Sequence, residues 1–138
     1  MKVVNPYLNF DGNTEAAFNF YKSVFGGEFT MVMRMKDAQG MPIPEGQEDK
    51  IMHIALPLSS GQVLMASDNC NEGTFKAGNN VFISLHADNE EEGKKLYDAL
   101  AVGGQPNHPY EKQFWGSWHG NLTDQFGINW MVNFDPVM

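Results

Sequence analysis

Two segments of the chain repeat apolar residues at helical spacing, and each ends at a pair of glycines. The first segment runs from about Asn13 to Phe25 and is followed by Gly26-Gly27. The second runs from about Asn89 to Val102 and is followed by Gly103-Gly104. The side-chain oxygen of Asn or Asp can accept a hydrogen bond from a free N–H of the first turn, so Asn13 is predicted to cap the first helix and Asp88 or Asn89 the second.

The remaining apolar residues fall in short runs bounded by Gly, Asn, Asp or Pro, a pattern typical of strands. The predicted strands are Lys2–Phe10, Phe29–Met35, Ile51–Leu58, Gln62–Ser67, Val81–His86, Trp118–Leu122 and Ile128–Phe134. A further strand is expected around Gln105–Tyr110, although Pro106 and Pro109 interrupt it.

The two halves of the chain repeat each other at fixed offsets. A shift of 76 places the first helical segment on the second, and a shift of 66 places His53 on His119 and Met65 on Met131. The difference between the offsets indicates an insertion in the first half, at about Asp37 to Asp49. We therefore predict an α+β fold of two tandem βαβββ modules, about 1–70 and about 78–136, within one domain covering 1–138.

Composition narrows the class of function. The 138 residues include 17 acidic and 9 basic side chains, for a net charge of −8, and no cluster of Lys and Arg that could grip a phosphate backbone. We expect no nucleic-acid partner. No apolar run is long enough for a membrane span, and Cys70, the single cysteine, indicates a reducing compartment. The expected location is the cytoplasm.

Several short motifs, taken in their order along the chain, resemble those of the vicinal-oxygen-chelate superfamily of glyoxalases, extradiol dioxygenases and bleomycin-resistance proteins. The resemblance is strongest to its PhnB-like group. The motifs are Pro6-Tyr7-Leu8-Asn9-Phe10, Phe20-Tyr21, Phe25-Gly26, Leu64-Met65-Ala66-Ser67-Asp68, Phe114-Trp115-Gly116 and Thr123-Asp124-Gln125-Phe126-Gly127 with Trp130-Met131. The resemblance spans about residues 5 to 133. It implies that the two modules form a curved mixed-sheet cup around a small-molecule site, and that the chain forms a homodimer.

The resemblance also implies where a divalent metal would be held, on the first and last strands of each module. Carried onto this sequence with the offsets of 76 and 66, these positions are Pro6, Leu64, Phe82 and Trp130. None of the four side chains can coordinate a divalent cation, which takes imidazole, carboxylate or thiolate donors. We therefore predict no cofactor and no metal at the usual place. A displaced site built from His and Asp residues stays open.

Candidate catalytic and ligand-binding residues lie outside the implied metal positions. His53 is a candidate general acid or base, because imidazole titrates near neutral pH, and Asp68 or His119 could assist it. The alternative is a half-buried histidine bonded to backbone, with Asp68 as a turn cap. An aromatic stretch holding Phe114, Trp115 and Trp118 suits a flap over an apolar ligand or packing across a dimer interface. The predicted ligand-binding residues are Leu64, Phe82, Phe114, Trp115, Trp118 and Trp130.

Three functions follow as hypotheses. The first is a PhnB-like protein that binds a small apolar or aromatic metabolite, with metal-independent acid–base catalysis. The second is a non-catalytic binding protein of the bleomycin-resistance kind that sequesters its ligand. The third is a metal-dependent lyase or dioxygenase with a displaced His/Asp site. The ubiquinone-methyltransferase name carried by part of the PhnB-like group is not supported by a glycine-rich strand-to-helix turn of the kind that holds S-adenosylmethionine.

Overall fold

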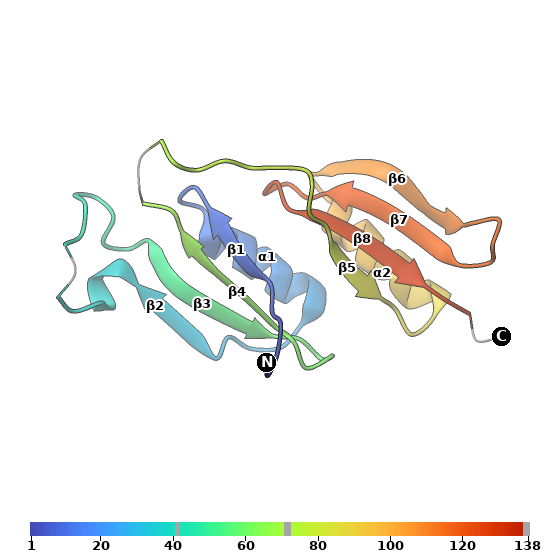
Figure 1. The fold of residues 1–138 in the computed structure, drawn as a ribbon, viewed down its shortest axis with the longest axis horizontal. Helices are drawn as coiled ribbons and strands as arrows, with labels where there is room; N and C mark the ends of the chain where they lie inside the picture. Colours follow the sequence, from blue (N-terminus) through green and yellow to red (C-terminus); the bar gives the residue numbers. More distant parts are fainter. Residues whose placement is uncertain (41, 71–72, 137–138) are drawn as a thin grey trace. The chain divides into compact units, whose positions relative to one another are not determined.

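The computed structural model describes residues 1–40, 42–70 and 73–136, and it divides into two compact units, Met1–Lys76 and Ala77–Met138. Each unit is a four-stranded sheet with one helix against one face (Figure 1). No helix in these described ranges is long and apolar enough to cross a bilayer.

Both units have the same order of elements. The first contains β1 (Tyr7–Phe10), α1 (Thr14–Phe25), β2 (Met31–Arg34), the 3-10 helix η1 (Met35–Asp37), β3 (Ile51–Pro57) and β4 (Val63–Asp68). The second contains β5 (Ile83–His86), α2 (Glu90–Ala101), β6 (Gln105–Lys112), β7 (Trp118–Thr123) and β8 (Asn129–Phe134). The strand orders are β1-β4-β3-β2 and β5-β8-β7-β6, and the first strand of each unit is parallel to the last. The predicted α+β fold with two βαβββ modules is confirmed.

The start of α1 differs from the prediction. The Asn13 side chain makes no capping hydrogen bond, and the buried carboxylate of Asp68 accepts the Thr14 backbone N–H at 3.0 Å in its place. A carboxylate suits this position because its full charge faces the positive end of the helix dipole. Of the two predicted caps of the second helix, Asn89 is the one that forms, since its side chain accepts the Glu92 N–H at 2.8 Å.

Alternation along the strands separates a helix-facing side from an open side in the first unit. Ile54, Leu56, Leu64 and Ala66 are buried, and they pair across β3 and β4 as Ile54 with Ala66 and Leu56 with Leu64. These side chains pack under α1, whose buried residues include Phe18 and Tyr21. The residues between them on each strand face away from the helix.

The second unit is built the same way around Trp130. Leu122, Trp130 and Val132 are fully buried on the side of α2. Gly120 is required here, because a Cβ atom at this position would lie 2.7 Å from the Tyr110 Cα and 2.9 Å from the Tyr97 ring. The close approach of β6, β7 and α2 therefore depends on a residue without a side chain.

The pairing of the strands corrects one predicted correspondence between residues of the two units. Tyr7 lies opposite Met65, whereas Ser84 lies opposite Met131, so the first strands are offset by 77 while the last strands are offset by 66. The position equivalent to Pro6 is therefore Ile83, and not Phe82. The helices do repeat at 76, but this spacing does not carry over to the strands, where one residue of slip turns a side chain to the other face.

The inserted segment of the first unit is the connection from β2 to β3. It covers residues 35–50, whereas the matching connection in the second unit covers only residues 113–117. Arg34 holds the base of this connection: its guanidinium pairs with Glu15 at 2.7 and 3.0 Å and donates to the Asp49 backbone carbonyl at 2.9 Å.

Candidate functional site

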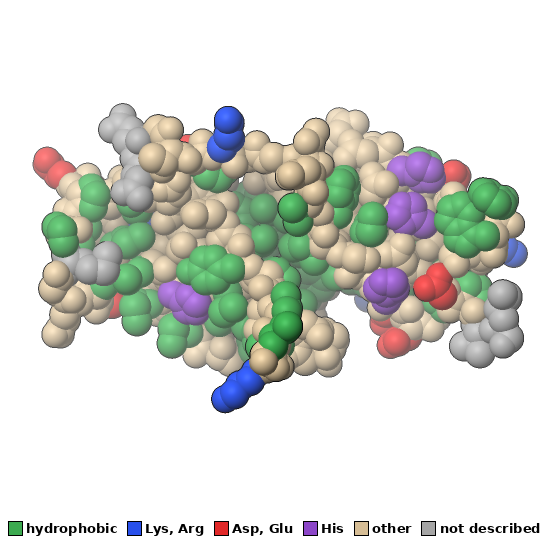
Figure 2. All heavy atoms as spheres, viewed as in Figure 1, with side chains coloured by type: hydrophobic (Ala, Val, Ile, Leu, Met, Phe, Trp, Pro, Cys, Tyr) green, Lys and Arg blue, Asp and Glu red, His purple; other side chains and the backbone are tan. Residues whose placement is uncertain are grey.

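The open side of the first sheet, here named the first open face, carries thioether, aromatic and imidazole side chains. Its members by strand alternation and pairing are Tyr7, Asn9, Met31, Met33, His53, Ala55, Met65 and Ser67. Tyr7 and Met31 are about half exposed, at 51% and 46%. Hydrophobic side chains cover much of this face in Figure 2. A sheet surface with flexible thioethers around a few polar atoms suits a small, largely apolar ligand.

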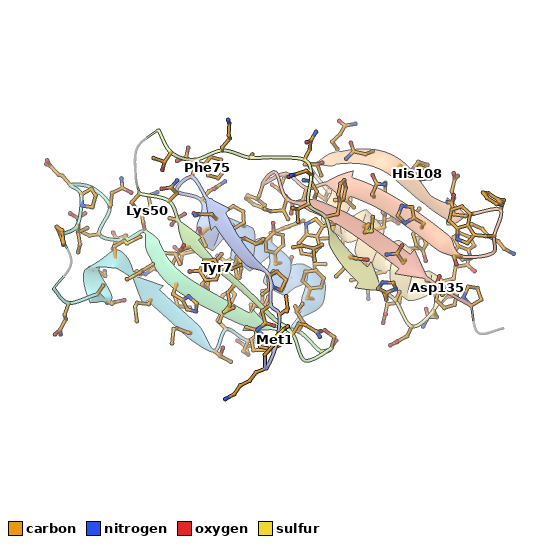
Figure 3. The ribbon with its side chains drawn as sticks, in the orientation of Figure 1. Met1, Tyr7, Lys50, Phe75, His108 and Asp135 are labelled. Carbon is orange, nitrogen blue, oxygen red and sulfur yellow. The ribbon has the colours of Figure 1, made fainter. Side chains whose placement is uncertain are left out.

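Tyr7 and His53 form the polar centre of this face. The Tyr7 hydroxyl lies 3.3 Å from His53 Nδ1, and the two ring centroids are 5.7 Å apart. Tyr7 projects from β1 on the side of the sheet away from α1 (Figure 3). When the hydroxyl donates to Nδ1, the neutral imidazole carries its proton on Nε2. His53 can then exchange a proton with a ligand, which is the chemistry predicted for it.

Asp68 does not join His53. Its Oδ1 accepts hydrogen bonds from the Thr14 N–H at 3.0 Å and the Thr14 hydroxyl at 2.7 Å, and its Oδ2 accepts the Ile51 N–H at 2.8 Å. The side chain is buried on the helix side of β4, whereas His53 lies on the open side of β3. Both carboxylate oxygens tie α1 and β3 to β4, so the described hydrogen bonds of Asp68 cap the start of α1 and not the turn after β4.

The open side of the second sheet, here named the second open face, is polar. Three of the four histidines belong to this face: His86 on β5, His108 on β6 and His119 on β7. Figure 2 shows histidine side chains gathered over this sheet, and Figure 3 labels His108 among them. The two faces of the repeat therefore differ in chemistry, although His53 and His119 occupy matching places in their ladders.

Hydrogen bonds set the tautomer of His119. The Asn133 amide nitrogen donates to the Ser84 hydroxyl at 2.9 Å and to the Leu85 carbonyl at 3.2 Å, which leaves its oxygen facing His119 Nδ1 at 2.8 Å. Nδ1 is therefore the donor, and Nε2 of neutral His119 is an acceptor, 3.4 Å from the Asn121 amide. Both ring nitrogens of His119 therefore have side-chain partners within the second sheet.

Two of the predicted ligand-binding residues are core residues. Leu64 and Trp130 are fully buried on the helix sides of their sheets. The Trp130 indole N–H donates to Asp124 Oδ2 at 2.8 Å, and Asp124 also accepts the N–H groups of Phe126 and Ile128. Trp130 therefore closes the β7–β8 hairpin from the inside.

The other predicted aromatic residues lie nearer the surface. Phe82 is 37% exposed, and Phe114 and Trp115 form an edge-to-face pair at the tip of the β6–β7 hairpin, with centroids 4.8 Å apart. Trp118 packs against the Tyr110 ring with centroids 5.5 Å apart. A ligand role for these four side chains stays a prediction.

The positions implied for a divalent metal do not fit one. After the register correction they are Pro6, Leu64, Ile83 and Trp130, whose side chains carry no imidazole, carboxylate or thiolate. Across residues 1–40, 42–70 and 73–136, no three His, Cys, Asp or Glu side chains are grouped so that they could hold a metal ion.

A pocket of about 350 Å³ opens at the carboxyl ends of β1 and β4, under the 35–50 connection. Asn9 and Ser67 of the first open face line it, together with Met35 and Cys70. Burial raises the pKa of the Cys70 thiol, with a further rise from the charge of Asp68. Tyr7, Asn9 and Ser67 were not among the predicted site residues. Tyr7 and Asn9 are two residues apart on a strand and therefore share a face, which the sequence could have indicated; Ser67 shares that face through its pairing with Asn9.

Sequence comparison identifies relatives along the whole chain. The sequence model of the family described as 3-demethylubiquinone-9 3-methyltransferase matches residues 2–133. Protein YjdN of Escherichia coli K12 is 31% identical over 143 residues, covering 94% of this chain and 93% of that protein.

Solved structures similar to this chain also cover nearly its full length. Protein PA1353 of Pseudomonas aeruginosa is 37% identical, with a TM-score of 0.87 over 98% of each chain. A PhnB protein of Bacillus cereus is 25% identical, with a TM-score of 0.80 over 97% of this chain and 100% of the other. A glyoxalase/bleomycin resistance protein/dioxygenase family enzyme of Burkholderia phytofirmans is 16% identical, with a TM-score of 0.62 over 95% and 98%, which shows a shared fold. The chain belongs to the PhnB-like family, whose sequence model is described as 3-demethylubiquinone-9 3-methyltransferase.

Proposed function

We propose that this chain binds a small, mostly apolar metabolite on the first open face and exchanges a proton with it through His53. The apolar body of the ligand lies on the thioethers of Met31, Met33 and Met65. Its ionisable or polar atom meets the Tyr7–His53 pair. No step of the proposal uses a metal.

One observation carries the proposal: the Tyr7–His53 pair lies beside the thioether side chains of the first open face. The Tyr7 hydroxyl approaches Nδ1 at 3.3 Å, so the second ring nitrogen is available to a ligand. Met33 is directly opposite His53 in the β2–β3 ladder, and Met65 is directly opposite Tyr7 in the β1–β4 ladder. An apolar ligand held between these thioethers would therefore have one proton donor or acceptor within its reach.

The second hypothesis, sequestration without turnover, gains support from the position of Asp68. A general base is commonly oriented by a third group, and Asp68 is instead bonded to Thr14 and Ile51. His53 then has Tyr7 as its described side-chain partner. A protein that only binds its ligand needs nothing more.

The test begins with a thermal-shift screen of uncharged and aromatic metabolites on the wild-type protein. A ligand that binds the native state raises the midpoint of unfolding by mass action, whatever reaction follows. Each metabolite that binds is then incubated with the protein, and mass spectrometry reads whether a product forms. Product formation supports catalysis, and a stable stoichiometric complex supports sequestration.

His53→Gln separates binding from proton transfer, because glutamine keeps hydrogen-bonding atoms but does not titrate near neutral pH. We expect turnover to fall at least a hundredfold, in line with the usual contribution of general acid–base catalysis, with ligand affinity changed only a few-fold. His86→Gln is the matched control, since His86 is an exposed histidine of the second sheet. Unchanged turnover in His53→Gln, or equal losses in both variants, would overturn the assignment of His53.

A further inference from the structure

The pocket at the carboxyl ends of β1 and β4 continues the first open face. Asn9 and Ser67 are the next members of that face after Tyr7 and Met65, two residues along each strand. The 35–50 connection contributes apolar walls, and the end of β4 and the segment after it complete the lining. These residues are Met35, Pro42, Ile43 and Pro44, and Asp68, Asn69 and Cys70. At about 350 Å³ the pocket is in the range of small-molecule sites.

Asn9, which is exposed, and Ser67, which is half-buried, are polar side chains on the sheet side of this pocket. Asn9 and Ser67 are directly opposite each other in the parallel ladder. Within the described ranges, neither the Asn9 amide nor the Ser67 hydroxyl hydrogen-bonds to another protein group. Each of these groups both donates and accepts. A ligand group with one donor and one acceptor could therefore satisfy both side chains at once.

The charges around the pocket favour an uncharged ligand group. Among the described residues that line it there is no Lys, Arg or His, and the one carboxylate, Asp68, has both oxygens bonded to Thr14 and Ile51. Lys50 is directed to the Gly12 carbonyl at 2.9 Å. An anion placed here would lose its hydration and gain no cation, which is costly at a half-buried site.

We propose that this pocket binds an uncharged group with both a hydrogen-bond donor and an acceptor, of the carboxamide class, through Asn9 and Ser67. The inference rests on the proposed function, since it assigns the head group of the ligand whose body lies on the first open face. The ligand's carbonyl accepts from the Asn9 amide or the Ser67 hydroxyl. Its N–H donates to the oxygen of the other.

Hydrogen bonds join the two ends of the 35–50 connection, which roofs the pocket, to each other. The Met35 N–H donates to the Lys50 carbonyl at 2.9 Å, and the Lys36 N–H donates to the Glu48 carbonyl at 3.0 Å. The Cys70 thiol lies 3.5 Å from the Gln47 side-chain oxygen. The ends of the roof are therefore held together, and its Gln47 side chain contacts the segment that follows β4.

The test uses benzamide and benzoate, which have nearly the same shape and differ in charge. Cys70 lines the pocket and is the single cysteine of the chain, so its alkylation by N-ethylmaleimide reports occupancy. Benzamide has few atoms, so its dissociation constant is expected on the order of millimolar. At ten times that constant it should slow alkylation about tenfold, because one molecule in eleven stays free. Benzoate at the same concentration should slow it less than twofold.

Variants locate the binding groups. Asn9→Ala and Ser67→Ala should each weaken benzamide protection at least fivefold, whereas Ser59→Ala, in an exposed turn, should leave it unchanged. The thermal midpoint with each compound gives the same ranking without using the thiol. Equal protection by benzoate, no stabilisation by benzamide, or unchanged protection in Asn9→Ala and Ser67→Ala would overturn the inference.

The same experiment separates this inference from the proposed function. Benzamide protection that depends on Asn9 and Ser67 establishes the pocket, even where His53→Gln binds and converts every metabolite like the wild type. Loss of turnover in His53→Gln, together with benzamide protection that does not depend on Asn9 and Ser67, supports the proposed function of the first open face and rejects the pocket. The two failures therefore have different readouts.

Discussion

The substitution Asp68→Asn tests whether this carboxylate supports the fold or the chemistry. In the wild type it accepts three hydrogen bonds, from the N–H and hydroxyl of Thr14 and from the N–H of Ile51, and all three residues are buried. Asparagine keeps one oxygen and replaces the other with an N–H₂ group. With its oxygen toward Thr14, the new amide nitrogen would face the Ile51 N–H, donor against donor.

The expected loss follows from these contacts. A buried N–H left without an acceptor costs about 1–3 kcal/mol, and hydrogen bonds to a charged group are worth about 1.5–3 kcal/mol against about 1 kcal/mol for neutral ones. One orphaned donor and two weakened bonds together give a decrease of about 3–5 kcal/mol in the free energy of unfolding. That is a large part of the total stability of an ordinary domain, which is about 5–15 kcal/mol.

Urea unfolding measures this loss. Far-UV circular dichroism follows both units, while the three tryptophans, Trp115, Trp118 and Trp130, all report on the second unit. Asp11→Asn is the matched control, because Asp11 is exposed in the turn before α1 and undergoes the same change of charge. It should alter stability by less than about 0.5 kcal/mol.

A graded variant keeps the test informative where Asp68→Asn does not fold. Thr14→Val removes only the hydroxyl that donates to Asp68 at 2.7 Å, and it should cost about 1–3 kcal/mol. The reasoning fails if Asp68→Asn stays within 1 kcal/mol of the wild type. A stable Asp68→Asn protein without turnover would restore the carboxylate as a partner of His53.

Three further predictions follow from packing and charge. Gly120→Ala should destabilise the second unit by more than about 3 kcal/mol in urea unfolding, because the added Cβ would meet the Tyr110 backbone at 2.7 Å; unchanged tryptophan emission midpoints would contradict this. The hydrogen bond from Arg34 lowers the pKa of Glu15, so this pair stabilises the fold fully above the unfolded value of about 4.3, and its contribution disappears as pH falls through the lowered folded-state pKa. Glu15→Gln should therefore speed proteolysis of the 35–50 connection at pH 7 and make no difference at low pH. Burial raises the pKa of Tyr97, so the contribution of this side chain to the stability of the fold is complete below about pH 10 and is lost as pH rises through its folded-state pKa. Tyr97→Phe should therefore flatten the alkaline decline in the thermal midpoint of unfolding.

The sequence predicted the elements well because their signals are local. Helical spacing and glycine stops place both helices within one or two residues of α1 and α2. Even the interrupted strand around Gln105–Tyr110 forms, as β6, because prolines are tolerated on an edge strand. The repeat at 66 is also exact in the ladders, where His53 and His119 hold matching places.

The site was predicted less well, because spacing along the chain does not show which way a side chain faces. Leu64 and Trp130 were expected at the ligand, yet both lie on the helix sides of their sheets and are fully buried. Phe82 was matched to Pro6 by the helix offset, whereas the ladder matches Ile83. In a strand, one residue of error moves a side chain from the core to the open face.

By itself, the sequence determined the class of fold, the two repeated modules and the insertion. These depend on residue types and on short-range order along the chain. Only the tertiary structure decided that Asp68, rather than Asn13, holds the start of α1, and that Tyr7 is the partner of His53, 46 residues away. Both contacts join strands and helices distant in sequence, so they depend on sheet register, which forms only when the whole unit packs.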